Sequence, residues 1–191
     1  GYTLLLSSSS GNIEKEENQI NHFRSLGVDG LIIASLSLEY RATDFIQKLH
    51  KENFPYIMIS YMHDPDYWYI GSNHELGGYM AAEHLINIGY SSIGYVHIAR
   101  GNLLSEVRKN GYYRALTENN LPYSSDMIYY QDAEDYDAGY DRIQRGYSFG
   151  LQFAKMKNKP EALVVYSDSV ALGFLKACSE TGVKVPEDVA I

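Results

Sequence analysis

The sequence predicts an α/β protein made of two similar lobes, each with a parallel sheet covered by helices. Short apolar runs alternate with amphipathic stretches along all 191 residues. The run LII at 31–33 is continuously apolar, which is typical of a parallel strand buried on both faces. Residues 42–49 carry apolar side chains at i, i+3, i+4 and i+7, which predicts a helix. Both halves of the chain repeat this strand–helix order.

The first half supplies three expected strands, an edge strand and two helices. The acidic start of one of these helices suits the positive end of the helix dipole. In order, we expect a strand at 3–6 that opens into a polar loop, a helix at 13–26, strands at 31–33 and 54–60, a helix at 42–49 between them, and a short edge strand at 68–72.

The first half ends with a further helix, at 73–90, for which Asn73 is the expected N-cap. Gly77 and Gly78 lower its helix propensity, so we expect close packing on a neighbour. The expected inward faces are Leu76, Met80, Leu85 and Ile88 here, and Tyr140, Ile143, Tyr147, Leu151 and Ala154 on a helix at 138–155. The other elements are strands at 91–98, 127–130 and 161–168, helices at 106–119 and 169–181, and the start of a strand at 189–191. We place the lobe boundary after Gly89, giving subdomains 1–89 and 90–191.

Composition and charge exclude several classes of protein. The formal net charge is −8, which disfavours direct binding of this segment to a phosphate backbone. Cys178 is the only cysteine, so the chain cannot form an internal disulfide. The sequence has no apolar run of 18 residues and no signal-peptide pattern, so we expect no membrane partner.

Catalytic signatures are missing from the sequence. It contains no G-x-S-x-G elbow, no P-loop and no G-x-G-x-x-G motif, and its six histidines include no i, i+4 pair. Cys178 lies on an apolar helix face, where a buried structural thiol is a better interpretation than a nucleophile. We therefore predict no enzyme activity, no metal site and no cofactor.

Four stretches together resemble the lactose/galactose repressor (LacI/GalR) family of bacterial transcription regulators. They are GVDGLIIA at 27–34, SNHELGGYMAAEHLINIGYSSIGYV at 72–96, RKNGYYRAL at 108–116 and SDSVALGFLKACSETGVKVPEDVAI at 167–191. The resemblance covers essentially the whole chain in the family's order and spacing. It implies the effector-binding core of such a regulator, with two Rossmann-like lobes of the periplasmic binding protein-like type I fold.

The same resemblance implies that both lobes are incomplete. In the family, a DNA-binding headpiece, a first strand and a helix precede the segment that matches GYTLLL, and further elements follow VPEDVAI. Subdomain 1–89 would then lack its first strand and helix, and subdomain 90–191 its last elements. In the sheet order 2-1-3-4-5 the first strand is central, so we expect no closed, continuous sheet from these residues alone.

The expected ligand site lies in loops after the strands, because ligands of open α/β sheets bind beyond the carboxyl ends of the strands. These loops are rich in hydroxyl, amide and carboxylate groups, as a neutral polar ligand requires. They are 7–12, 35–38, 60–62, 72–73, 99–105, 131–135 and 167–169.

The resemblance assigns ligand contacts to individual positions. Arg108 matches the arginine with which the family grips ligand hydroxyls or a carboxylate, although by composition alone it could be a solvated arginine. Asp168 borders the cleft in the family, and a structural role as helix cap or hinge contact is an equal alternative. The remaining candidates are Ser167, where asparagine is usual; Ser72, where aspartate is usual; Asn73, which could be a cap only; Glu134, at an aromatic position; Tyr136, which could replace that ring; and the weaker Asn102 and Ser105.

These observations predict a cytoplasmic effector-sensing and dimerisation domain of a LacI-family regulator. Its partners would be a small molecule, expected to be a carbohydrate, a second copy of the chain, and operator DNA through the missing headpiece. Two other classes stay open: an exported sugar-binding receptor of a transport system, and a sugar-modifying enzyme on a similar sheet. The sequence upstream of Gly1 separates the first two, since a helix-turn-helix indicates a regulator and a signal peptide a receptor.

Overall fold

The computed structural model describes residues 1–10, 12–35, 41–59, 66–97, 102–130 and 142–191. Its contacts divide the chain into two compact units, unit 1 at Gly1–Ser72 and unit 2 at Asn73–Ile191. This division falls after Ser72, whereas the sequence pattern placed it after Gly89. The reason is helix α3 (His74–Asn87), which packs along α4 (Leu103–Glu118) and therefore belongs to unit 2.

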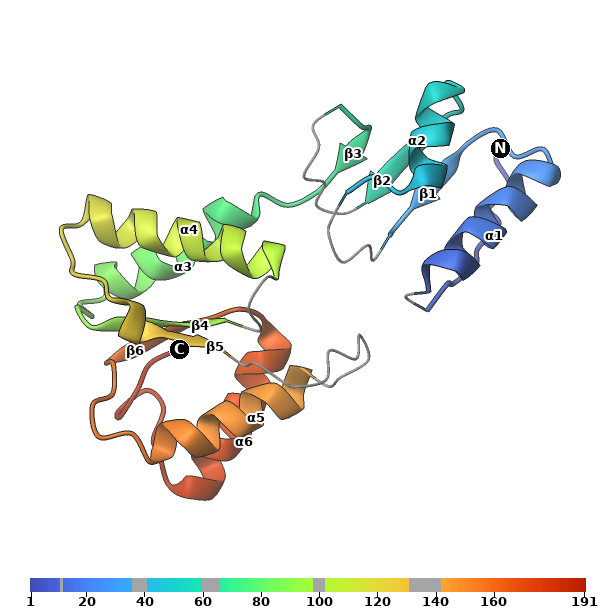
Figure 1. The fold of residues 1–191 in the computed structure, drawn as a ribbon. Helices are drawn as coiled ribbons and strands as arrows, with labels where there is room; N and C mark the ends of the chain where they lie inside the picture. The colour runs from blue at the N-terminus through green and yellow to red at the C-terminus, as the bar shows by residue number, and fades with distance from the viewer. Residues whose placement is uncertain (11, 36–40, 60–65, 98–101, 131–141) are drawn as a thin grey trace. The chain divides into compact units, whose positions relative to one another are not determined.

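Unit 1 is a parallel three-stranded sheet with helices on one face (Figure 1). Its elements are α1 (Ile13–Ser25), β1 (Leu31–Ile33), α2 (Asp44–Lys51), β2 (Tyr56–Ile59) and β3 (Tyr69–Ile70), and the strand order is β1-β2-β3. The core joins Ile20 of α1 and Ile46 and Leu49 of α2 to alternate strand residues, Leu31 and Met58 among them. These elements agree with the predicted ones, including the edge position of β3.

The other face of the unit 1 sheet carries exposed isoleucines. The pairs Ile32–Ile57 and Ile59–Ile70 are in register between neighbouring parallel strands, so all four side chains point to one face. Ile32 is 69% exposed, Ile59 51% and Ile70 63%. The prediction that 31–33 is buried on both faces is therefore wrong for Ile32, because α1 and α2 cover only one side.

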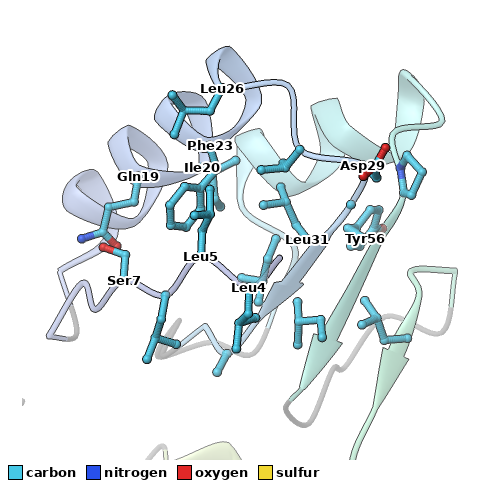
Figure 2. A pocket seen from close by; sticks show the side chains of 18 of the residues that line it. Leu4, Leu5, Ser7, Gln19, Ile20, Phe23, Leu26, Asp29, Leu31 and Tyr56 are labelled. Carbon is cyan, nitrogen blue, oxygen red and sulfur yellow. The ribbon is translucent and has the colours of Figure 1, made fainter. Parts of the chain in front are cut away.

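Residues 3–6 do not form the predicted strand. They have no regular secondary structure and pair with none of the described strands, and Leu4 and Leu6 are strongly exposed. A β-strand needs a neighbour for its backbone N–H and C=O groups, and none of the described residues provides one for this segment. Figure 2 shows the cavity that lies between this segment, α1 and β1, with Leu5 beside Ile20 and Phe23. Its volume is about 1300 Å³.

Unit 2 is a sheet with helices on both faces (Figure 1). It contains α3, β4 (Ile93–His97), α4, a 3₁₀ turn η1 (Ser125–Met127), β5 (Ile128–Tyr130), α5 (Arg142–Ala154), β6 (Ala162–Val165) and α6 (Asp168–Thr181). The parallel strand order is β5-β4-β6. One core cluster joins α3 and α4 to one face, and a second joins α5 and α6 to the other. Cys178 lies in the second cluster, as the buried-thiol interpretation predicted.

In both helix pairs of unit 2, a glycine of each helix contacts the backbone of the other helix. A Cβ at Gly78 of α3 would lie 1.9 Å from the carbonyl oxygen of Arg108, and one at Gly111 of α4 would lie 1.9 Å from that of Glu75. Between α5 and α6, Gly146 and Gly173 make the same kind of contact. Each helix therefore touches the backbone of its partner, which confirms the tight packing predicted for Gly78. Gly77 has open space beside it.

These contacts turn the helices away from the predicted faces. Helix α3 buries Gly78, Ala82 and Leu85, which confirms the prediction for Leu85, while the other three predicted residues, Leu76, Met80 and Ile88, are exposed. Helix α5 buries the face formed by Arg145, Gly146, Phe149, Gly150 and Phe153, in place of Ile143, Tyr147, Leu151 and Ala154. The predicted Tyr140 and the first turn of that helix lie outside the described residues. Glycines, with no side chain, mark these interfaces.

The chain ends at a single β-bridge. Gly182 caps α6 in the left-handed conformation, with φ +79°. Ala190 then pairs with Ala162 at the free edge of β6, and its carbonyl accepts a 2.8 Å hydrogen bond from the Leu163 N–H. The expected start of a strand is present here as this one bridge.

Candidate functional site

The carboxyl ends of the three strands of unit 2 lie together at one edge of the sheet. His97 of β4 is in register with Tyr130 of β5, and Val96 is in register with Val165 of β6. Helices α4 and α6 begin near this edge, after β4 and β6. Their first turns therefore place side chains where a ligand of a parallel sheet binds.

Arg108 is held at this edge by two hydrogen bonds. Its Nη1 donates to the carbonyl oxygen of Tyr166, just after β6, at 2.5 Å, and its Nη2 lies 3.1 Å from Nδ1 of His74. The guanidinium carbon also stands 4.7 Å from the centre of the Tyr166 ring. A guanidinium carries five N–H donors, and the described residues use two of them, which leaves three for another partner. Arg108 is half-buried rather than a freely solvated helix residue.

Ser167 and Asp168 follow directly and begin α6. Ser167 occupies the N-cap position without a side-chain cap bond, and Asp168 is the first helical residue and exposed. The Ser167 hydroxyl oxygen is buried and has no hydrogen-bond partner among the described residues. An unpartnered buried hydroxyl costs on the order of 1–3 kcal/mol, which a polar ligand or a water molecule would relieve.

A second polar cluster, at β4 and β5, was not found by sequence reasoning. His97 is fully buried, and its Nε2 lies 2.8 Å from Oε1 of Glu106 in the first turn of α4. Oε2 of the same carboxylate accepts a 2.5 Å hydrogen bond from Lys109. The Tyr130 ring lies 4.8 Å from the His97 ring. The one available signal was a histidine ending an apolar strand run.

The charges of this cluster support one another. Burial alone would raise the pKa of Glu106, but the hydrogen bond and charge of Lys109, together with His97, hold it below its usual range. Burial would likewise lower the pKa of Lys109, but Glu106 outweighs it and the pKa is raised. Both groups are therefore charged near neutral pH, and α4 presents cations and an anion to the strand ends.

Several predicted ligand residues have internal roles. Asn73 caps α3 through a 2.9 Å bond from the Leu76 N–H, as predicted, and Asn102 caps α4 through a 2.9 Å bond from the Ser105 N–H. Ser105 is fully buried, and its carbonyl oxygen accepts a 3.0 Å bond from the Tyr95 hydroxyl. Ser105 thus contributes to the core beneath the site.

The other predicted positions are not brought to this edge by the described contacts. Ser72 is exposed and is the last residue of unit 1. Glu134 and Tyr136 lie outside the described residues. The cavity of unit 1 is lined by 1–10, α1, 26–34 and 55–57, so of the predicted ligand loops only 7–12 reaches it, and none of the individually predicted contact residues does.

The chemistry of the edge is that of a polar binding site. It combines donors on Arg108, an unpartnered hydroxyl on Ser167, an exposed carboxylate on Asp168 and the Tyr166 ring. Such a set can bind a ligand with several hydroxyl or carboxylate groups. No group of three or more potential metal ligands occurs among the residues that the structure describes. Within that same part of the chain, no helix is long and apolar enough to span a membrane.

Known proteins are similar to this chain in sequence and in fold. Repressors named HTH-type transcriptional repressor PurR are 30% identical over 192 residues in Aliivibrio salmonicida and in Actinobacillus pleuropneumoniae. These alignments cover 100% of this chain and 55% and 54% of the relatives, so the chain spans about half their length.

Two solved structures have the same fold. The transcription regulator CcpA of Lactococcus lactis is 26% identical with a TM-score of 0.72, over 97% of this chain and 64% of that one. A LacI family transcriptional regulator from Lactobacillus casei, with bound glucose, is 23% identical with a TM-score of 0.73, over 100% and 68%. All of these relatives are named as transcriptional repressors or regulators.

These relatives confirm the predicted resemblance to a family of transcription regulators. A match of the second unit to a family model agrees with it. Residues 82–191, more than half of the chain, match the periplasmic binding protein-like domain. The match contains β4, α4 and α6, which build the polar edge around Arg108. The chain belongs to the periplasmic binding protein-like domain family.

Proposed function

We propose that this chain is the effector-sensing core of a LacI-type transcription regulator. The effector is a small polar molecule that binds at the carboxyl edge of the unit 2 sheet. Arg108 is its main hydrogen-bond donor, and Ser167 and Asp168 add a hydroxyl and a carboxylate. Ser72, Asn73, Glu134, Tyr136, Asn102 and Ser105 remain weaker candidates, and the internal bonds of Asn73, Asn102 and Ser105 favour support over direct contact.

The main support for this proposal is the fixed orientation of the Arg108 guanidinium, which still has unused donors. Two of its donors are fixed by Tyr166 and His74, so the orientation of the guanidinium is set before any ligand arrives. A preorganised fork loses less conformational entropy on binding than a free side chain. The remaining donors have no other described role, which is what a ligand-binding arginine requires.

The ligand class we favour is a carbohydrate. Sugars offer many hydroxyls and an apolar ring face, and the edge offers donors, acceptors and the Tyr166 ring. The glucose bound to the Lactobacillus casei relative supports the same class. An exported sugar-binding receptor is the alternative, but the relatives found are regulators, which favours the first reading.

The regulator would work in the cytoplasm as a homodimer on operator DNA. The net charge of −8 argues against DNA binding by these residues, so a separate headpiece would make that contact. The effector would shift the protein between two arrangements only if it binds one of them more tightly.

Calorimetric titration with a panel of monosaccharides, beginning with D-glucose, tests the proposal. Replacing Arg108 with alanine should weaken binding by about 1–3 kcal/mol and leave the circular dichroism spectrum unchanged. Arg114→Ala is the matched control, because Arg114 lies on the same helix, is exposed and pairs with Glu75. Equal affinities for the wild type and Arg108→Ala would remove Arg108 from the site.

A further inference from the structure

Helix α3 positions Arg108 at two points, one on its backbone and one on its side chain. At Gly78 the two helix backbones approach so closely that a Cβ would lie 1.9 Å from the carbonyl oxygen of Arg108 and 2.7 Å from its carbonyl carbon. One turn earlier, His74 meets the guanidinium itself. The place and the direction of the Arg108 side chain therefore both depend on α3.

The protonation state of His74 follows from the chemistry of this contact. A guanidinium has only donors, so a hydrogen bond from Arg108 Nη2 to Nδ1 of His74, 3.1 Å away, requires an unprotonated Nδ1. The imidazole must then be neutral, with its hydrogen on Nε2. Protonation would replace this acceptor with a donor and place a second cation beside Arg108.

We propose that neutral His74 is a positioning residue that orients Arg108 for the effector, so that acidification weakens effector binding. The inference rests on the proposed function of Arg108.

The surroundings of His74 favour the neutral form. Burial, and then the positive charge of Arg108, lower the pKa of His74 from its ordinary value. Its helix neighbour Glu75 is engaged with Arg114 at 2.6 Å. Among the described residues, Arg108 is the charged group whose effect on this pKa is resolved. The contact is therefore intact at neutral pH and is lost as the pH falls through the lowered pKa.

The experiment is an NMR pH titration of the histidine ring signals in the chain without ligand. His74 should titrate below the value of about 6.5 of a free histidine, as the Nε2–H tautomer. In Arg108→Met its pKa should rise. The exposed His84, on the same helix, is the internal control for the comparison. An unchanged His74 pKa in Arg108→Met, or an Nδ1–H tautomer, overturns the inference, whatever ligand the protein binds.

The functional arm uses the monosaccharide that gives the tightest binding in the panel. His74→Ala should weaken its binding roughly 3- to 10-fold at pH 7.5. His74→Asn keeps an acceptor near the Nδ1 position and should remove the pH dependence between 5 and 7.5. His84→Asn is the control. If no sugar binds, the proposed ligand class fails, while the NMR titration still decides the role of His74. If a sugar binds wild type and His74→Ala equally, the positioning role fails.

Discussion

The two units differ in how their parallel sheets are covered. In unit 2 every residue of β4 is buried, because α3 and α4 lie on one face and α5 and α6 on the other. In unit 1 the pattern along β1 alternates between buried and exposed, because α1 and α2 cover one face only. Parallel sheets normally have both faces covered. The number of helical layers on each sheet therefore determines how fully its strands are buried.

This difference in cover indicates that unit 2 is the more stable unit and that it also contains the polar binding edge. Unit 2 has two core clusters, backbone-to-backbone helix contacts and the polar edge around Arg108. Unit 1 has one core cluster, an exposed isoleucine face and a cavity beside β1. We expect local stability to be higher in unit 2, and hydrogen exchange of β4 to be slower than that of β1.

Adding a methyl group between α3 and α4 should have the largest effect. Gly111→Ala would place Cβ 1.9 Å from the Glu75 carbonyl oxygen and 2.6 Å from the Tyr79 amide nitrogen. Neither backbone can move without separating the helices. We expect a loss of about 3 kcal/mol in the free energy of unfolding of unit 2, measured by urea denaturation.

Gly77→Ala is the matched control, one residue from the equivalent Gly78. A Cβ at Gly77 meets nothing within 4 Å, so alanine should stabilise α3 by up to about 1 kcal/mol through its higher helix propensity. Two neighbouring glycines should therefore respond with opposite signs. Equal responses of Gly77→Ala and Gly78→Ala would contradict the close contact of the two helices.

Two substitutions on opposite faces of the unit 1 sheet test its one-sided cover. Met58→Ala, on the covered face, should cost about 2–3 kcal/mol because it leaves a cavity in the core. Ile70→Ala, on the exposed face, should change the free energy of unfolding by less than about 1 kcal/mol. Both changes in the free energy of unfolding can be measured by denaturation, followed by the fluorescence of Trp68. Trp68 lies in the same unit, next to Tyr56. A large loss in Ile70→Ala would mean that this face is covered in solution.

Sequence patterns predicted the elements better than their faces. Asn73 was identified as a cap because a cap is a local interaction between neighbouring residues. The inward faces of α3 and α5 were predicted from large apolar residues, but the helices meet through Gly78, Gly111, Gly146 and Gly173. A glycine has no hydrophobic signal, so close backbone contact is recognised only when the partner helix is known.

The prediction of the site was limited in the same way, because sequence patterns do not show which elements pack together. Arg108 could be assigned because a family resemblance places it, whereas the His97–Glu106–Lys109 cluster could not. Its members are separated along the sequence and meet only when β4 and α4 pack. The segment 3–6 failed for a related reason, since its apolar residues satisfy the strand pattern while no described strand lies beside them. Periodicity describes one segment and cannot show whether a partner exists.

The smallest effect concerns the amino ends of β4 and β6, where a carboxylate distinguishes the two units. In unit 2, Glu161 accepts hydrogen bonds from the Ser91 and Ser92 amides at 2.9 and 3.0 Å. In unit 1 the corresponding link between β1 and β2 is a backbone bond from Leu31 to Pro55. The Ser92 and Ser91 amides lower the pKa of Glu161 below its ordinary 4.5. The stabilisation is therefore present above pH 4.5 and is lost as the pH falls through the lowered pKa.

Glu161→Gln should accordingly lower the melting temperature of unit 2 at pH 7 by a few degrees at most, because the amide oxygen keeps part of the bonding without the charge. The difference from wild type should shrink as the pH is lowered from 7 toward 3, because the wild-type carboxylate is protonated too as the pH falls through the lowered pKa. Glu187→Gln, an exposed position in the same unit, should match wild type at both pH values. A difference that stays constant between pH 7 and pH 3 would show that the charge of Glu161 does not contribute.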